Sequence, residues 1–289
     1  MTVYPFVLHL GRWPVIGNFD LTGYGVMMMV AFLMAGWAIQ LQLQRRQLNP
    51  EYAADIVMAA VIGGLIGAKL WYVALTGESP FHRGGFVWYG GFLGATAAIL
   101  GLGWLKRVPT RFTLDLCAAP LALGYALGRV GCFLVNDDYG IPSSLPWAMK
   151  FPAGLPPTTG AELQNALHVH LPPGAPLDQV FAVHPTEIYE TITMLVVFWW
   201  LWRQRDHPLG SGWLTGWYLV LGGLERFLVE FLRAKDDRLL GPFTLAQVTS
   251  AGLVLVGVYL LNRWRGATAS DAEVVKALAP RPVASSAGG

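Results

Sequence analysis

Seven long apolar stretches divide this sequence, and they constrain its fold more than any other feature. Each has close to the roughly 20 residues that a helix needs to cross a bilayer. They cover residues 21–42, 53–75, 86–105, 113–135, 186–203, 211–232 and 244–262. Charged residues make up 13% of the chain, whereas soluble domains contain roughly 25%. The sequence therefore predicts an all-α polytopic membrane protein with about seven transmembrane helices.

Basic residues collect in alternate loops between these stretches. They are Arg45 and Arg46, then Lys106, Arg107 and Arg111, then Arg203 and Arg205, and finally Arg263 and Arg265. Because loops rich in Lys and Arg stay in the cytoplasm, we expect these four loops to be cytoplasmic. This orientation places the N-terminus outside and the C-terminus in the cytoplasm.

We expect residues 1–265 to form one transmembrane domain. Residues 137–185 are rich in Pro and Gly and too long for a simple turn, which predicts a small extracytoplasmic head. The tail 266–289 is poor in large apolar residues and is expected to be disordered. The net charge of +2 gives no reason to expect nucleic acid as a partner. Cys117 and Cys132 lie too far apart along one helix to form a disulfide.

Ionisable residues inside membrane spans are costly and usually functional. The predicted spans contain Lys69, Asp115, Arg129, Glu187, Glu190, Glu225, Arg226, Glu230 and Arg233. By the predicted topology, the arginines of the fourth and sixth spans both lie towards the outer side. A helix would place Arg129, Cys132 and Asn136 on one face, and likewise Arg226, Glu230 and Arg233. The spacing therefore predicts one shared polar cavity.

Arginine offers a planar fork that holds phosphate with two hydrogen bonds and keeps its charge when desolvated. The anion expected at this depth is a phospholipid headgroup. A second interpretation stays open, in which Arg226 and Glu230 form an internal ion pair and Arg233 extends to the interface.

Other candidate residues lie near the outer ends of the spans. His184 precedes the fifth span and could move a proton, or could have a structural role. Gly90 and Gly91 open the third span and would permit close approach of a ligand or a helix. Tyr24 begins the first span, where a lone tyrosine is also typical of the membrane interface.

These segments together resemble the prolipoprotein diacylglyceryl transferase family of bacterial inner-membrane enzymes. The resemblance rests on "YGGFLGA", "GRVGCFLVNDDYG", "HPTEIYE" and "ERFLVEFLR". It implies transfer of a diacylglyceryl group from phosphatidylglycerol to the thiol of a lipobox cysteine in a secreted precursor, with release of glycerol phosphate. It implies no metal and no soluble cofactor.

The resemblance also assigns roles to residues. It makes Arg129 and Arg226 the essential pair and carries the last glycine of the signature onto Gly140. Together with the candidates above, the predicted catalytic residues are Arg129, Arg226, Tyr89 and His184. The predicted substrate-binding residues are Tyr24, Gly90, Gly91, Asn136, Asp137, Gly140, Glu190, Glu230 and Arg233.

Four positions depart from the usual pattern of that family. Cys132 and Val135 replace asparagines, Asp137 replaces a glutamate, and Tyr89 replaces a histidine. Tyrosine is a poor general base at its ordinary pKa of about 10, so either His184 substitutes for it or Tyr89 only orients a substrate. A buried thiol is usually inert, which favours Cys132 as a small apolar replacement.

Two alternative functions remain at the level of sequence. One is a related glycerophospholipid transferase with a different acceptor, because the departures lie near the presumed site of attack. The other is a catalytically inactive protein that binds or transports lipid. The internal repeats that are usual in transporters are not visible in the sequence.

Overall fold

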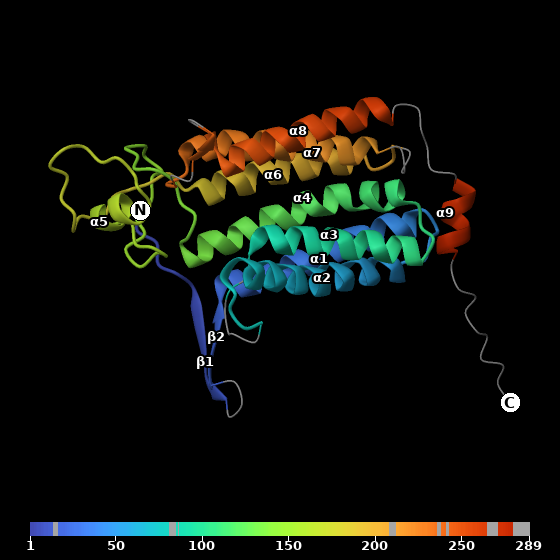
Figure 1. Ribbon diagram of the computed structural model, residues 1–289, viewed down its shortest axis with the longest axis horizontal. Coiled ribbons are helices and arrows are strands. Elements are labelled where there is room, and N and C mark those ends of the chain that lie inside the picture. Colours follow the sequence, from blue (N-terminus) through green and yellow to red (C-terminus); the bar gives the residue numbers. More distant parts are fainter. Residues whose placement is uncertain are drawn as a thin grey trace. The chain divides into compact units, whose positions relative to one another are not determined.

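The computed structural model is mainly helical, and it describes residues 1–13, 17–80, 85, 87–207, 212–235, 238–240, 243–264 and 271–279. A helix occupies each of the seven apolar stretches (Figure 1). They are α1 (Gly23–Arg45), α2 (Glu51–Thr76), α3 (Trp88–Leu105), α4 (Thr110–Val135), α6 (Thr186–Arg203), α7 (Trp213–Val229) and α8 (Leu245–Arg263). The predicted positions of the helices are therefore confirmed.

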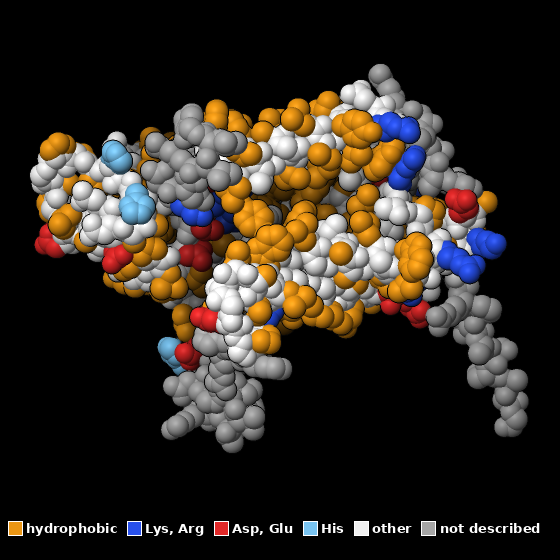
Figure 2. Space-filling view, in the orientation of Figure 1, with side chains coloured by type: hydrophobic (Ala, Val, Ile, Leu, Met, Phe, Trp, Pro, Cys, Tyr) orange, Lys and Arg blue, Asp and Glu red, His pale blue; other side chains and the backbone are white. Residues whose placement is uncertain are grey.

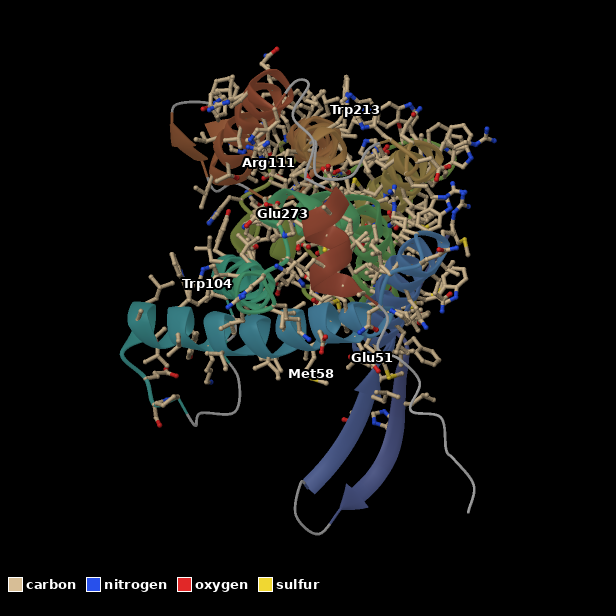
Figure 3. The ribbon with its side chains drawn as sticks, turned by 90° about the vertical axis from the view of Figure 1, so that its right-hand side faces the viewer. Glu51, Met58, Trp104, Arg111, Trp213 and Glu273 are labelled. Atoms are coloured by element: carbon tan, nitrogen blue, oxygen red, sulfur yellow. The ribbon has the colours of Figure 1, made fainter. Side chains whose placement is uncertain are left out.

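Within the described residues, four helices are long and apolar enough to cross a membrane: α1, α2, α4 and α8. Large apolar side chains cover much of the visible face of the helices (Figure 2). Met58 of α2 and Trp104 of α3 are 59% and 77% exposed (Figure 3). Such surfaces are unfavourable in water and suit contact with lipid. The chain is a largely α-helical, multi-pass membrane protein.

The chain divides into two compact units, each described by itself. The first comprises residues 1–33, 121–203 and 216–262, and the second comprises 34–120, 204–215 and 263–289. Helices α1 and α4 each contribute residues to both units. All of the arginines that the sequence predicted to be functional belong to the first unit.

Small residues bring the helices of the first unit close together. A Cβ atom added to Gly131 of α4 would lie 3.1 Å from Met27 Cβ of α1. A Cβ added to Gly223 of α7 would lie 2.8 Å from Val254 Cγ2 of α8. Without side chains at these glycines, the backbones approach closely, which is a common way for helices to pack in membranes.

In the second unit, α2 and α3 pack against each other through glycines. A Cβ on Gly67 would lie 2.8 Å from the Cα of Gly94, and one on Gly91 would lie 3.4 Å from Ala68 Cβ. The stretch "GGLIGA" at residues 63–68 therefore forms a helix-packing surface.

The segment that follows α4 forms a small packed head with its own apolar core. The core consists of Tyr139, Phe151, Leu163, Val183 and Ala234, each at most 4% exposed. The rings of Tyr139 and Phe151 stack with centroids 5.6 Å apart. The only regular element within residues 137–185 is the short helix α5 (Gly160–Asn165). Backbone hydrogen bonds between distant segments therefore hold most of the head together.

Several elements were not predicted from the sequence. Strands β1 (Val7–Trp13) and β2 (Gly17–Thr22) form an antiparallel hairpin, and β3 (Arg238–Leu240) pairs with β4 (Phe243–Thr244). In the tail that was expected to be disordered, Asp271–Leu278 form helix α9. The carbonyl of Leu278 accepts a hydrogen bond from the backbone of Asn49 at 2.8 Å. Residues 265–270 and 280–289 of that region lie outside the described residues.

Candidate active site

Three arginines and three carboxylates alternate in a closed ring of ion pairs in the first unit. In order around the ring they are Arg129, Glu190, Arg226, Glu230, Arg233 and Asp138, and every neighbouring pair lies within 4.0 Å. Arg129 comes from α4, Glu190 from α6 and Arg226 from α7, while Asp138 lies in the loop after α4. We call these six residues the ion-pair ring.

Arg129 is the most extensively bonded member of the ion-pair ring. Its Nε pairs with Glu190, and its Nη1 lies 2.8 Å from Asp138 Oδ2. The hydroxyl of Tyr125, one turn earlier on α4, donates to Glu190 at 3.0 Å. Arg129 Nη2 lies 3.4 Å from the same hydroxyl. These contacts fix the plane of the guanidinium, so that its N–H groups are directed before an anion binds.

Glu230 links the other two arginines. Its Oε2 lies 2.6 Å from Arg226 Nη1 and 3.9 Å from Arg233 Nε. Its Oε1 accepts a hydrogen bond of 3.1 Å from Thr244 at the start of α8. Helix α7 ends at Val229, and Glu230–Leu232 form the 3-10 turn η1. The predicted helical face therefore ends early, although the three charged side chains still meet.

Asp138 is the exposed member of the ion-pair ring. Its side chain is 40% exposed, whereas the side chains of Glu190 and Glu230 are each 1% exposed. Partial burial alone would raise the pKa of Asp138, but Arg233 and Arg129 hold it below its ordinary value. Asp138 is therefore ionised at neutral pH.

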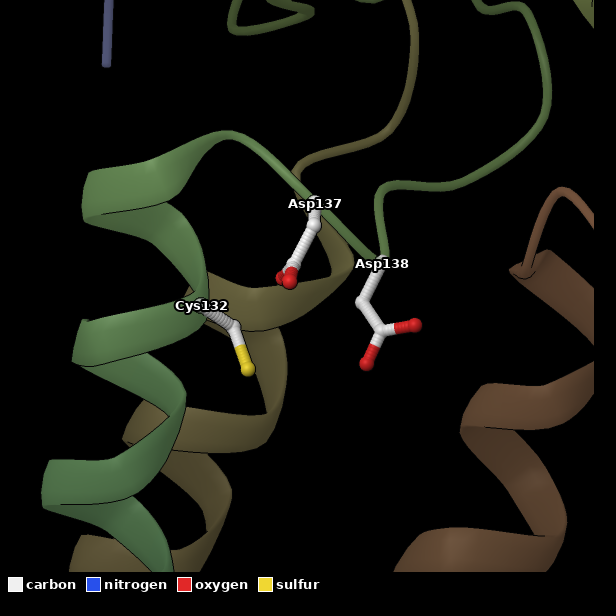
Figure 4. Close-up of side chains that lie close together, drawn as sticks. All are labelled: Cys132, Asp137 and Asp138. Carbon is white, nitrogen blue, oxygen red and sulfur yellow. The ribbon is translucent and has the colours of Figure 1, made fainter. Parts of the chain in front are cut away.

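Asp137 and Cys132 lie beside the ion-pair ring (Figure 4). Burial, together with the neighbouring carboxylate of Asp138, raises the pKa of Asp137 to about 6. Cys132, Asp137 and Asp138 are close enough for their ligand atoms to hold a metal ion. However, Arg129 Nη1 lies 3.6 Å from Cys132 Sγ as well as 2.8 Å from Asp138. A guanidinium thus supplies positive charge here, and a metal ion would have to displace it.

Comparisons with known proteins identify the family of the chain. The family described as prolipoprotein diacylglyceryl transferase matches residues 13–263. The chain belongs to this family. It is 31% identical over 260 residues to the phosphatidylglycerol–prolipoprotein diacylglyceryl transferase of Thermosynechococcus vestitus, covering 86% of this chain and 90% of the relative. It is 30% identical over 285 residues to the enzyme of the same name from Nitratidesulfovibrio vulgaris, covering 89% and 94%.

The structure brings together the two arginines that the family resemblance singled out and the two glutamates, Glu190 and Glu230, that were candidates because they lie in predicted spans. Arg129 and Arg226 both lie within 4.0 Å of Glu190, so the predicted meeting of the two arginine-bearing helices is confirmed. The side chain of Arg233 is 7% exposed and lies in the ion-pair ring. The alternative in which Arg233 extends to the interface is therefore wrong. Arg226 and Glu230 do form an ion pair. This contact agrees with a polar cavity for phosphate as well as with a purely structural ion pair.

Gly140 positions the end of the Asp138 loop within this family member. Its backbone N–H donates to His184 O at 2.8 Å, and it forms a bridge with Arg233. A Cβ at this position would lie 2.8 Å from His184 Cβ and 2.9 Å from Thr186 Cγ2. Glycine is therefore required by the close approach of two other segments, and Gly140 acts through positioning.

Asn136 and Tyr24 lie near the site without joining the ion-pair ring. Helix α4 ends at Val135, and Asn136 adopts a left-handed conformation with φ of 57°. Its side chain donates to Val3 O at 3.2 Å. Helical spacing placed Asn136 on the same face as Arg129, and this prediction is wrong because the helix ends before Asn136. Tyr24 of α1 lies against α4, where a Cβ on Gly131 would be 3.3 Å from the tyrosine ring.

His184 lies at the end of the head, and its ring contacts Tyr189 in the first turns of α6. Its Nδ1 lies 3.2 Å from the hydroxyl of Tyr189, which also accepts a 2.7 Å hydrogen bond from Trp147 Nε1. Burial lowers the pKa of His184 below its ordinary value. The imidazole is thus neutral at pH 7 and can accept a proton.

Tyr89, Gly90 and Gly91 open α3 and belong to the second unit. Gly90 and Gly91 face α2, where a Cβ on either would meet the backbone of Gly67 or Gly64. Close approach of a helix, one of their two predicted uses, therefore explains Gly90, whereas a Cβ on Gly91 would make an ordinary contact at 3.4 Å. A role for these three residues in catalysis or substrate binding stays a prediction.

Sequence reasoning did not include Asp138, Tyr125 or Thr244 among the site residues. Asp138 could not be found from spacing, because its link to Arg233 depends on the loop conformation, with φ of 63° at Asp138. Tyr125 could have been found from its spacing of four residues before Arg129. Two further buried carboxylates, Glu187 and Glu225, have no hydrogen-bond partner among the described residues.

Proposed function

We propose that this protein transfers a diacylglyceryl group from phosphatidylglycerol to the thiol of a lipobox cysteine in a prolipoprotein. The observation that carries the proposal is the convergence of Arg129, Arg226 and Arg233 in one ion-pair ring. Arginine forks match phosphate geometry and stay charged in a membrane. The named activity of the relatives requires recognition of such a phosphate.

The reaction forms a C–S bond to the acceptor thiol and breaks the C–O bond between the diacylglyceryl carbon and the phosphate. The thiol proton passes to a base, and the electron pair of the broken bond leaves with glycerol phosphate. Arginines that are already in place stabilise the negative charge that develops on the departing phosphate. We assign this role to Arg129 and Arg226, with Glu190 and Glu230 orienting the two guanidinium groups.

The base that accepts the thiol proton is His184 or Tyr89 in this proposal. His184 is neutral at pH 7 and connects through Tyr189 to the start of α6. If His184 is the base, the His184→Gln variant has a lower kcat, whereas the Tyr89→Phe variant keeps the full rate. The opposite pattern would assign proton transfer to Tyr89.

We also propose that all seven helices cross a bacterial inner membrane, with the N-terminus and the head outside and the C-terminus in the cytoplasm. Helices α3, α6 and α7 contain 18, 18 and 17 residues, which is within the range of about 17–25 that spans a bilayer. In the second unit, Arg46 donates to Arg205 O at 2.8 Å, and Arg111 stacks on Trp264 at 5.1 Å. These contacts bring the first basic loop near the third and the second near the fourth, which supports a common cytoplasmic side under the positive-inside rule.

A direct assay tests the proposed function. Purified protein is incubated with labelled phosphatidylglycerol and a peptide that contains a lipobox cysteine, and the thioether product and glycerol phosphate are measured. Thioether formation is the expected result. Release of glycerol phosphate without modified peptide would indicate a different acceptor, and lipid binding without turnover would indicate a protein that only binds or transports lipid.

Arg129→Ala provides the matched test of the phosphate site. Loss of one preorganised donor typically lowers kcat by roughly 10²–10³-fold, and Arg129 also holds Glu190 and Asp138. Arg45→Ala is the control, because Arg45 is 54% exposed and pairs only loosely with Asp206 at 3.4 Å. Near-normal turnover by Arg129→Ala would contradict the proposed phosphate site.

A further inference from the structure

We infer that the Asp138 carboxylate occupies the place of the headgroup phosphate between Arg129 and Arg233 in the free protein. The lipid phosphate displaces this carboxylate on binding, and Asp138 displaces the phosphate product after the reaction. This inference rests on the proposed function, because it names the residue that exchanges with the substrate anion. Asp138 lies between Arg129 and Arg233, with its two carboxylate oxygens directed at different guanidinium groups. A phosphate held by two arginine forks would present its oxygens in the same way.

Exposure distinguishes Asp138 from the other carboxylates of the ion-pair ring. Glu190 and Glu230 are 1% exposed and are held by Tyr125 and Thr244. An anion that displaced Glu190 or Glu230 from its arginines would leave a buried carboxylate without its partners, which is strongly unfavourable. Asp138 is 40% exposed and lies on a loop. An incoming anion can therefore displace Asp138 most easily.

The charge of the ion-pair ring also favours this exchange. Counted by formal charge, three arginines and three carboxylates sum to zero, and Asp138 contributes one negative charge. The phosphodiester of phosphatidylglycerol carries one negative charge as well, so the exchange keeps the ring neutral. Glycerol phosphate is a monoester, which carries roughly 1.5 to 2 negative charges at pH 7. Return of Asp138 restores neutrality and assists release of this product.

The structure leaves room for the displaced side chain. A pocket of about 490 Å³ adjoins Asp138 and Arg233 and is also lined by His168 and Lys235. The backbone carbonyl of Asp138 accepts a 2.8 Å hydrogen bond from Thr186 Oγ1. Rotation of the Asp138 side chain into this polar pocket therefore suffices, and the loop backbone can stay in place.

The first test compares wild type with Asp138→Asn. Inhibition by glycerol phosphate and by inorganic phosphate is measured together with kcat and KM for phosphatidylglycerol. Removal of the competing charge should tighten glycerol phosphate binding by about tenfold or more, which corresponds to about 1.4 kcal/mol or more. KM should fall, and kcat should fall as well because the product leaves slowly.

Two variants serve as controls. Asp138→Glu keeps the charge and should restore weak binding of glycerol phosphate. Asp178→Asn removes an exposed carboxylate elsewhere in the head and should match wild type. If Asp138 were only a structural ion-pair partner, Asp138→Asn would bind phosphate anions equally or more weakly and KM would rise. That result would overturn the inference.

A second measurement needs no substitution at Asp138. Wild-type protein is labelled at carboxylates with a water-soluble carbodiimide and an amine, with and without saturating glycerol phosphate. Labelling of Asp138, normalised to Asp178 in the same digest, should increase when the anion displaces it. Unchanged or reduced labelling would contradict displacement, even if Asp138→Asn fails to fold.

These binding measurements also separate the inference from the proposed function. They require no acceptor peptide and no thioether product. If wild type forms thioether but Asp138→Asn does not tighten anion binding, the inference fails and the proposed function stands. If Asp138→Asn tightens anion binding but the wild type modifies no peptide, the inference stands and the proposed function fails.

Discussion

Arg226 and Glu230 are joined by an ion pair of 2.6 Å between Nη1 and Oε2, one turn apart at the end of α7. The Glu230 side chain is 1% exposed, and its second oxygen accepts a hydrogen bond from Thr244 of β4, the residue directly before α8. The pair thus lies where helix α7 gives way to the 3-10 turn and the chain redirects towards Arg233. It both positions a guanidinium and connects α7 to α8.

Glu230→Gln is expected to destabilise the protein and to lower its activity. Loss of one charge from a buried pair typically costs roughly 3–5 kcal/mol, because the partner remains charged and poorly compensated. Thermal unfolding in detergent and the diacylglyceryl transfer assay measure the two effects. Asp206→Asn is the control, since it breaks the exposed pair with Arg45, which should cost less than about 1 kcal/mol. Equal stability of the two variants would contradict a structural role for Glu230.

Asp137 is expected to make stability depend on pH between about 4 and 6. Its pKa is raised to about 6 in the folded protein, so the folded state holds this proton more strongly than the unfolded chain. The resulting stability is fully present below the unfolded pKa and is lost as the pH rises through the folded pKa. Above pH 6, the wild type carries the full cost of a partly buried charge.

Asp137→Asn should therefore be more stable than wild type at pH 7.5, and the two should converge near pH 4. A gain of about 1 kcal/mol would appear as a rise of roughly 2–4 °C in Tm for a domain of this size. Unfolding curves of both proteins across pH 4–8 provide the measurement. A constant difference at all pH values would show that Asp137 does not titrate as described.

The helices could be predicted from the sequence because their signals are local. A run of about 20 apolar residues with arginines at its ends identifies a span without knowledge of its neighbours. Arg129 and Arg226 were likewise found from the cost of placing charge within such a run. The predicted orientation of the spans placed both arginines in one shared cavity, whereas their common partner Glu190 was seen only in the structure.

The residues that escaped prediction depend on irregular backbone. Asp138 reaches Arg233 because Asn136 and Asp138 both adopt left-handed conformations after α4. Helical spacing cannot describe this loop, and it also misplaced Asn136. The hairpin β1–β2 was missed because its two short strands do not show a regular alternation of apolar and polar residues.

Gly140→Ala is expected to abolish most activity and to lower stability. The added methyl group would lie 2.8 Å from His184 Cβ and 2.9 Å from Thr186 Cγ2, so at least one segment must move. That movement would separate the Asp138 loop from Arg233. Gly252→Ala in α8 is the matched control, because nothing lies within 4 Å of a Cβ at that position and alanine favours a helix. Retention of wild-type kcat by Gly140→Ala would show that the close packing at this glycine is dispensable.

Asp115→Ala should lower stability without changing substrate recognition, although Asp115 is also a charged residue within a predicted span. Its carboxylate accepts hydrogen bonds from Gly212 N at 2.8 Å, Thr215 N at 3.0 Å and Thr215 Oγ1 at 2.7 Å. It thus satisfies backbone donors at the start of α7, and loss of such a cap costs about 0.5–2 kcal/mol. We expect a lower Tm in detergent with an unchanged KM for phosphatidylglycerol, whereas Asp115→Asn should retain part of the cap. A large rise in KM at full stability would instead connect Asp115 to the lipid site.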